Sequence, residues 1–308
     1  MTAARGGPGT VCVVGVPMDL GAGRRGTDMG PSALRVARIC ERIEGMGITV
    51  RDAGELDVEI HETGDEGDQT MRFAETIASV CEQLAQVTHE ATADGTIPLV
   101  LGGDHSVAMG SVSGVSAALA GQRPLGMIYV DAHGDMNIPR SSPSGNVHGM
   151  SLAVLLGTGP ELLTGIGGVN PALAPERTVL MAIRDLDARE RELVRTSGVT
   201  AITMQDIDRD GMATMVERAL AVAGADDAAL YVSVDLDALD PSVAPGVGTP
   251  VAGGLTYREA HLLMELIAES GQLAGVDLVE VNPTLDHLNA TAEVAVDLVM
   301  SALGNRIL

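Results

Sequence analysis

The sequence contains no lysine. All 19 basic residues of the 308 are arginines, against 42 aspartates and glutamates, so the formal net charge is −23 at pH 7. A surface this negative repels polyanions, and we therefore discount nucleic acid and anionic membranes as partners. Two interpretations of the charge stay open. It either keeps the protein well solvated or adapts it to high internal salt, where screening relieves self-repulsion.

Cysteine is also scarce, and long apolar runs are missing. Cys12, Cys40 and Cys81 are odd in number and widely spaced, which argues against a disulfide framework and against a cysteine metal site. Buried thiols in a reducing compartment are the expectation. Residues 1–8 lead straight into a short strand, without the apolar stretch of a signal peptide, and no run approaches the roughly 18 apolar residues of a membrane span. We expect a cytoplasmic protein.

The pattern of apolar residues predicts an α/β fold. Hydrophobic residues make up 45% of the chain, enough for a large core. Short apolar runs predict eight strands, at residues 11–16, 48–51, 97–101, 125–130, 179–183, 200–204, 229–234 and 275–281. Helical spacing predicts helices at residues 31–44, 68–93, 107–120, 149–156, 188–196, 211–223, 256–270 and 290–303.

The alternation of strands and helices implies a parallel sheet, within a single domain spanning residues 1–308. Periodicity does not distinguish an eight-stranded barrel from an open, doubly wound sheet. In either case functional groups belong at the carboxyl ends of the strands.

Acidic residues and histidines follow three of the predicted strands. Alternation along an extended backbone lets Asp131, His133 and Asp135 project to one side after strand 125–130. Such groups are costly to desolvate unless a cation binds them, and oxygen and imidazole ligands without thiolate favour a hard or borderline cation. Mn²⁺ fits best, and Co²⁺, Ni²⁺ or Fe²⁺ stay possible. The three strand ends supply enough ligands for two ions: His105, Asp131, His133, Asp135, Asp235 and Asp237.

Motifs along nearly the whole chain resemble the arginase branch of the ureohydrolase family. They are Val16-Pro-Met-Asp-Leu-Gly21, Arg24-Arg-Gly-Thr-Asp-Met-Gly-Pro-Ser32, Gly102-Gly-Asp-His-Ser106, Asp131-Ala-His-Gly-Asp-Met-Asn137, Ser144-Gly-Asn-Val-His-Gly149, Ser233-Val-Asp-Leu-Asp-Ala-Leu-Asp-Pro241, Gly248-Thr-Pro250, Gly254-Leu-Thr-Tyr-Arg-Glu259 and Glu280-Val-Asn-Pro283. The resemblance implies a three-layer α/β/α sandwich around an open, parallel eight-stranded sheet, and a homotrimer or homohexamer.

The resemblance also assigns the ligands to two Mn²⁺ ions per subunit. It implies that Asp131 and Asp235 bridge the ions. His105 and Asp135 then complete one site, and His133 and Asp237 complete the other. Asp104 is expected to support the ligands or form a turn rather than to coordinate.

The chemistry that the resemblance implies is hydrolysis of a guanidinium group. A hydroxide held between two cations attacks the guanidinium carbon. Asp135 is expected to orient this hydroxide, and His148 to deliver a proton to the departing amine. Glu280 resembles the family carboxylate that pairs with the substrate guanidinium.

Residues of two loops resemble those that select L-arginine, giving L-ornithine and urea. Asn137 and Ser144 match positions that bind the α-carboxylate, with Ser142 as a third contact. Asp187 matches the carboxylate that faces the α-ammonium. A site built for these groups rejects analogues that leave them unpaired. Two further candidates are Glu190, one turn beyond Asp187, and Thr249 of the Gly248-Thr-Pro250 motif.

Some positions depart from the resemblance. Gly134 stands where arginases commonly have threonine, and Ala188-Arg189 where Pro-Gly is common. Three alternatives stay open: an agmatinase or other guanidino-acid ureohydrolase, a metal-dependent deacylase with one Zn²⁺, and a metal-binding regulatory protein. The complete set of six ligands argues against the last two.

Overall fold

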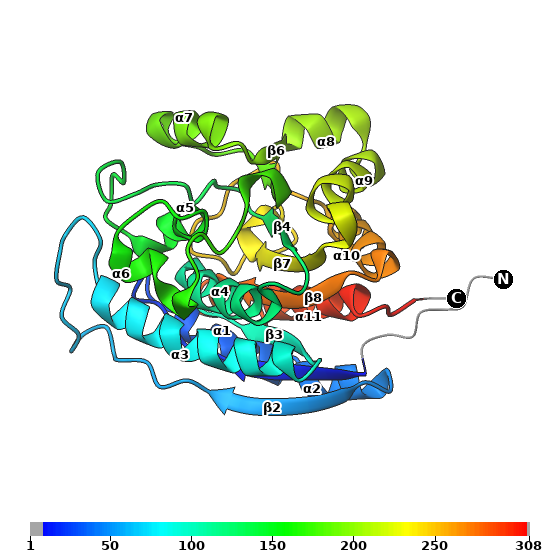
Figure 1. The fold of residues 1–308 in the computed structure, drawn as a ribbon. Coiled ribbons are helices and arrows are strands. Elements are labelled where there is room, and N and C mark those ends of the chain that lie inside the picture. The colour runs from blue at the N-terminus through cyan, green and yellow to red at the C-terminus, as the bar shows by residue number, and fades with distance from the viewer. Residues whose placement is uncertain (1–8, 307–308) are drawn as a thin grey trace.

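The computed structural model describes residues 9–306 and contains one open sheet of eight parallel strands, in the order β2-β1-β3-β8-β7-β4-β5-β6. Figure 1 shows β2 and β6 at its opposite edges. All eight predicted strands are present, and the sheet is open rather than closed into a barrel. The strands are β1 (Thr10–Gly15), β2 (Thr49–Glu55), β3 (Ile97–Leu101), β4 (Leu125–Val130), β5 (Thr178–Ile183), β6 (Thr200–Thr203), β7 (Ala229–Asp235) and β8 (Leu273–Val279).

Helices cover both faces of the sheet and complete the expected three layers (Figure 1). One face carries α1 (Gly30–Val36), α2 (Ile39–Gly45), α8 (Met204–Asp210), α9 (Met212–Ala223), α10 (Tyr257–Ser270) and α11 (Ala290–Ala302). The other carries α3 (Ala74–Ala93), α4 (Ala108–Leu119), α5 (Ser151–Leu155), α6 (Glu161–Thr164) and α7 (Ala188–Ser197).

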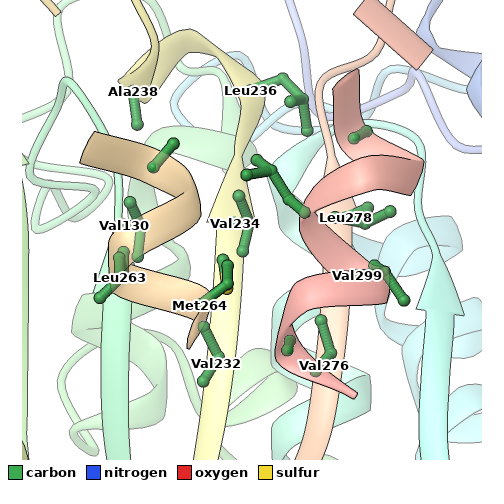
Figure 2. Close-up of a cluster of buried hydrophobic side chains, with 14 of the residues drawn as sticks. Val130, Val232, Val234, Leu236, Ala238, Leu263, Met264, Val276, Leu278 and Val299 are labelled. Carbon is green, nitrogen blue, oxygen red and sulfur yellow. The ribbon is translucent and has the colours of Figure 1, made fainter. Parts of the chain in front are cut away.

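Successive side chains of each strand point to opposite faces of the sheet, so the strands contribute to an apolar core on both faces. In β4, Ile128 and Val130 point into the cluster under α10 and α11, whereas Met127 and Tyr129 point into the cluster under α4 and α5. Figure 2 shows the first cluster, where Val130 lies beside Leu263 of α10, and other strand residues face Met264 of α10 and Val299 of α11. Strands buried on both faces explain the nearly continuous apolar runs of the sequence.

Strand register brings the predicted ligands to one edge of the sheet. Val130 pairs with Val234, and Leu278 pairs with both Val234 and Leu101. The next residues of β4 and β7, Asp131 and Asp235, therefore lie side by side at the carboxyl ends of adjacent strands. Because β8 and β7 lie between β3 and β4, chain segments more than 100 residues apart converge there.

Several predicted boundaries are wrong for one physical reason. The predicted helix 31–44 is divided into α1 and α2 at Arg38, which has φ 63°. The predicted helix 68–93 begins only at Ala74, because Phe73 has φ 57°. The last strand ends at Val279 rather than 281, because Glu280 has φ 65°. Each residue adopts the left-handed conformation that usually needs glycine, so local sequence gives no warning.

The short helix α8, which follows β6 directly, was not predicted. None of the helices formed by residues 9–306 combines the length and apolar character that a bilayer crossing requires.

Candidate metal centre and active site

Two groups of side chains that could hold a metal ion share Asp131 at the carboxyl edge of the sheet. The first consists of His105, Asp131 and Asp235, and the second of Asp131, His133 and Asp237. His105 Nδ1 lies 3.0 Å from Asp131 Oδ2 and 3.3 Å from Asp235 Oδ2. His133 Nδ1 lies 3.0 Å from Asp237 Oδ2.

The sixth predicted ligand lies beside the first group. Asp135 Oδ2 is 3.2 Å from His105 Nδ1 and accepts a hydrogen bond of 2.7 Å from the Tyr129 hydroxyl. The structure thus brings all six predicted ligands together. Asp104 points elsewhere: its carboxylate accepts hydrogen bonds from the backbone of Gly21 and Ser106, the role of a turn residue.

Two buried atoms test whether a cation fits this cluster. Among the described residues, His105 Nδ1 and Asp131 Oδ2 make no hydrogen bond, although both are buried and only 3.0 Å apart. Burial, followed by the charges of Asp237 and Asp131, raises the pKa of Asp235 well above its ordinary value. Buried carboxylates this close together need a compensating cation. The donor set therefore fits divalent metal ions.

A hydrogen-bonded chain behind His105 fixes which of its nitrogens faces the cluster. Ser233 Oγ lies 2.8 Å from His105 Nε2 and donates to Asp277, which also accepts from Ser111 Oγ at 2.7 Å. Since Ser233 uses its proton on Asp277, it accepts one from Nε2. His105 Nδ1 is then left with its lone pair toward the carboxylates, the tautomer that a metal ligand requires.

His148 and Glu280 form a second polar pair in the same cavity. His148 Nδ1 lies 2.9 Å from Glu280 Oε1, which also accepts the His105 backbone N–H at 3.0 Å. Burial lowers the pKa of His148, but the Glu280 carboxylate outweighs it and raises the pKa to about 9. His148 can therefore carry a proton at neutral pH.

The cavity reaches from the ligands to two surface loops. A space of about 280 Å³ is lined by His133, Asp135, Asn137, Ser142, Pro143, Ser144, Asn146, His148, Gly149, Asp185, Asp187, Glu190, Asp235, Asp237 and Thr249. An adjoining space of about 430 Å³ shares five of these residues and adds Glu280 and Arg24. The predicted substrate residues all border the first space.

The two loops are tied together at the far end of this cavity. Asn137 Nδ2 donates to Asp187 Oδ2 at 2.9 Å, and the Met136 backbone N–H donates to Glu190 Oε1 at 3.1 Å. Asp187 also caps α7, accepting from the backbone of Arg189 and Glu190. Burial and the charge of Asp135 raise the pKa of Glu190 to about 8.

The remaining predicted substrate residues differ in where their hydroxyls point. Ser142 and Ser144 accept backbone N–H groups of Gly145 and Asn146 within their own loop. Their hydroxyl protons stay available to a ligand. Thr249, by contrast, donates to Asp237 Oδ2 at 2.8 Å, so its hydroxyl supports a candidate metal ligand.

Sequence reasoning missed several residues of this site. Tyr129 lies within the predicted apolar strand 125–130, where nothing indicates that its ring stacks on His105 with centroids 4.3 Å apart. Ser233 stands in one of the motifs of the resemblance and Asp277 in a predicted strand, but neither is a predicted site residue, although a polar residue inside an otherwise apolar, buried strand is an available signal. Asn146, which belongs to the Ser144–Gly149 motif, and Asp185 line the cavity from loops, where no strand alternation indicates which side chains point inward.

This chain is similar in sequence and in fold to known proteins. The model of the "Arginase family" matches residues 9–304. The arginase of Bacillus caldovelox is 45% identical over 97% of this chain and 99% of its own length. The arginase of Bacillus subtilis (strain 168) is 46% identical, with the same two coverages. The crystal structure of arginase from Bacillus cereus superposes with a TM-score of 0.91 at 44% identity, covering 97% of this chain and 100% of that one.

Proposed function

Because this chain belongs to the arginase family, we propose that it hydrolyses the guanidinium group of L-arginine to L-ornithine and urea. The observation that carries the proposal is the pair of ligand groups sharing Asp131, which open into one cavity with His148 and Glu280. The cavity also has room and polar groups for the far end of an amino acid.

In this proposal the six clustered residues would hold two divalent cations, and Asp131 and Asp235 would serve both. Mn²⁺ is the first candidate for a site of carboxylates and imidazoles, ahead of Co²⁺, Ni²⁺ and Fe²⁺. When bound, such a pair of cations lowers the pKa of a water molecule and so supplies a nucleophile near neutral pH.

The remaining residues bind the substrate and move protons. Glu280 pairs with the substrate guanidinium, and Asp135 accepts a hydrogen bond from the attacking water. The new C–O bond forms at the guanidinium carbon, and the bond from that carbon to the ornithine nitrogen breaks. His148 donates the proton that the departing nitrogen needs, and its hydrogen bond to Glu280 keeps it protonated beforehand.

The far end of the cavity selects the amino acid. Asn137, Ser142 and Ser144 bind the α-carboxylate, and Asp187 with Glu190 faces the α-ammonium. Agmatine lacks the carboxylate and leaves the first three groups unpaired, which disfavours it. The role of Thr249 is to hold Asp237.

The deciding experiment is a urea assay on metal-free protein reloaded with Mn²⁺, with L-arginine and agmatine as substrates. We expect urea from L-arginine and a kcat/KM for agmatine lower by at least about a hundredfold, since several polar groups lose their partner. A preference for agmatine would make the chain an agmatinase. No urea from either substrate, with any of the four metals, would contradict the proposal.

We further propose a single catalytic domain that assembles as a homotrimer or homohexamer in the cytoplasm. The family match over residues 9–304 supports the single domain. The free thiols of Cys12, Cys40 and Cys81 suit a reducing compartment. Light scattering coupled to size-exclusion chromatography would measure the number of subunits.

A further inference from the structure

The guanidinium of Arg184 is hydrogen-bonded to backbone carbonyls rather than paired with a carboxylate. This residue follows the end of β5, and within residues 9–306 it forms no ion pair. Its guanidinium donates instead to backbone carbonyls: Nη2 to Asp237 and Val251, each at 2.7 Å, and Nη1 to Ala238 at 3.2 Å. Longer contacts reach the carbonyls of Ala182 and Leu239.

The backbone of Arg184 holds a different segment. The N–H groups of Arg184 and Asp185 both donate to the Ala132 carbonyl, at 2.9 and 3.0 Å. Ala132 lies between Asp131 and His133, and its own N–H donates to Asp237 Oδ1 at 3.1 Å. One residue therefore ties the ligand segment after β4 to the ligand segment after β7.

The backbone around the Arg184 guanidinium matches the shape and the donors of this group. A Cβ atom on Gly254 would lie 2.6 Å from Arg184 Nη2 and 2.5 Å from the carbonyl carbon of Leu239, so the backbone and the arginine together leave room only for glycine. Five carbonyl oxygens arranged around a planar group require a donor with several N–H bonds in fixed directions. Lysine carries the same charge but cannot reproduce that arrangement.

We propose that Arg184 is a positioning residue for the ligand group Asp131, His133 and Asp237, and that its guanidinium is needed for this group to bind its cation. The inference rests on the proposed function, in which the cluster binds two cations. In the other group, His105, Asp131 and Asp235, the imidazole is held by Ser233 and Asp277, and no hydrogen bond of the arginine side chain reaches any of the three residues.

The test is calorimetric titration of metal-free protein with Mn²⁺, which needs no turnover. We expect two cations per chain in the original protein. In Arg184→Ala and Arg184→Lys we expect one site to be kept and the affinity of the other to fall about ten- to a hundredfold, the usual effect of removing a group that orients a ligand. Millimolar guanidinium chloride should restore the second site in Arg184→Ala and leave the original protein unchanged.

Arg218→Ala is the matched control, because Arg218 is exposed on α9 and its loss changes the net charge equally. Unchanged affinities at both sites in both Arg184 variants would overturn the proposal. If Arg184→Lys alone bound both Mn²⁺ ions with the original affinities, the guanidinium would not be required. If both sites were weakened equally, the effect of Arg184 would not be specific to the group Asp131, His133 and Asp237. Fewer than two cations in the original protein would instead overturn the proposed function.

Discussion

His148 is the residue whose chemistry can be separated most cleanly from metal binding. It lines the cavity without belonging to either ligand group, and its only charged hydrogen-bond partner among the described residues is Glu280. In His148→Ala we expect kcat to fall about 10²- to 10³-fold, the usual contribution of a proton donor, while two Mn²⁺ ions still bind. Turnover and metal content measured on the same sample check this. His89→Ala, at an exposed position on α3, is the control. Unchanged kcat would remove His148 from the mechanism.

The proton on His148 gives a second prediction at this scale. Burial alone would lower the pKa of the imidazole, and the carboxylate of Glu280 raises it to about 9. In metal-free protein, NMR titration of the His148 ring should therefore show the protonated form through neutral pH and its loss near pH 9. In Glu280→Gln the attraction is gone but the burial stays, so the titration should move to lower pH. A midpoint that is the same in both proteins would show that Glu280 does not hold this proton.

Among the structural elements, the turn between β3 and α4 leaves no room for a larger residue at Gly103. A Cβ atom on Gly103 would lie 1.8 Å from the Met18 carbonyl oxygen, and the Gly103 carbonyl accepts the Glu280 N–H at 2.7 Å. Gly103→Ala must therefore displace the segment that carries His105. We expect a loss of about 2 kcal/mol in the free energy of unfolding, as for other overpacked sites, and weaker Mn²⁺ binding. Denaturant melts and calorimetry measure the two effects.

Gly45→Ala is the control for that substitution, because a Cβ atom there meets nothing within 4 Å. Gly45 also ends a helix, where alanine is compatible with the backbone. It should leave stability and metal affinity nearly unchanged. If Gly103→Ala behaved in the same way, the turn would have room to relax, and the tight approach to Met18 would not constrain His105.

The same elements show which parts of the site a sequence can predict. Asp131, His133, Asp235 and Asp237 were found because each follows an apolar run that forms a strand. Strand alternation and register then determine where the side chains go. His105 was found in the same way, after β3. The structure brings these side chains together as local pattern predicts, and their role as metal ligands stays a prediction.

What local pattern cannot predict is set by contacts between distant segments. Phe73 delays the start of a predicted helix to Ala74, because its backbone is left-handed, and its ring lies against His61 at a centroid distance of 4.7 Å. The Ser233–Asp277 hydrogen bond joins neighbouring strands separated by 44 residues. In the sequence, Arg184 looks like an ordinary charged residue of a loop. Only the folded structure shows that carbonyls of two other loops surround its guanidinium. Such arrangements exist only in the assembled fold.

At the scale of the whole molecule, both edges of the parallel sheet have features that discourage pairing with other chains. β2 is an edge strand whose side chains are mostly exposed, and it carries Arg51, Asp52 and Glu55. Arg35 pairs with Asp52 and covers part of this edge. The opposite edge strand, β6, has four residues. Charge on one edge and shortness of the other both discourage edge-to-edge association.

The charge of the whole chain gives the last prediction. The formal net charge is −23, so exposed carboxylates repel one another. Salt shortens the range of this repulsion, because the screening length falls from about 10 Å at 0.1 M to about 3 Å at 1 M. If the composition is an adaptation to high salt, the melting temperature should rise steeply with potassium chloride up to a few tenths molar and then level off. An added 2 kcal/mol would correspond to about 3 °C for a chain of this length.

Scanning calorimetry with Mn²⁺ held constant measures the melting temperature at each salt concentration. A continued linear rise, stronger in sulfate than in chloride, would indicate exclusion of salt from the surface instead of screening. Equal melting temperatures in dilute buffer and in molar salt would mean that the acidic surface serves solubility alone.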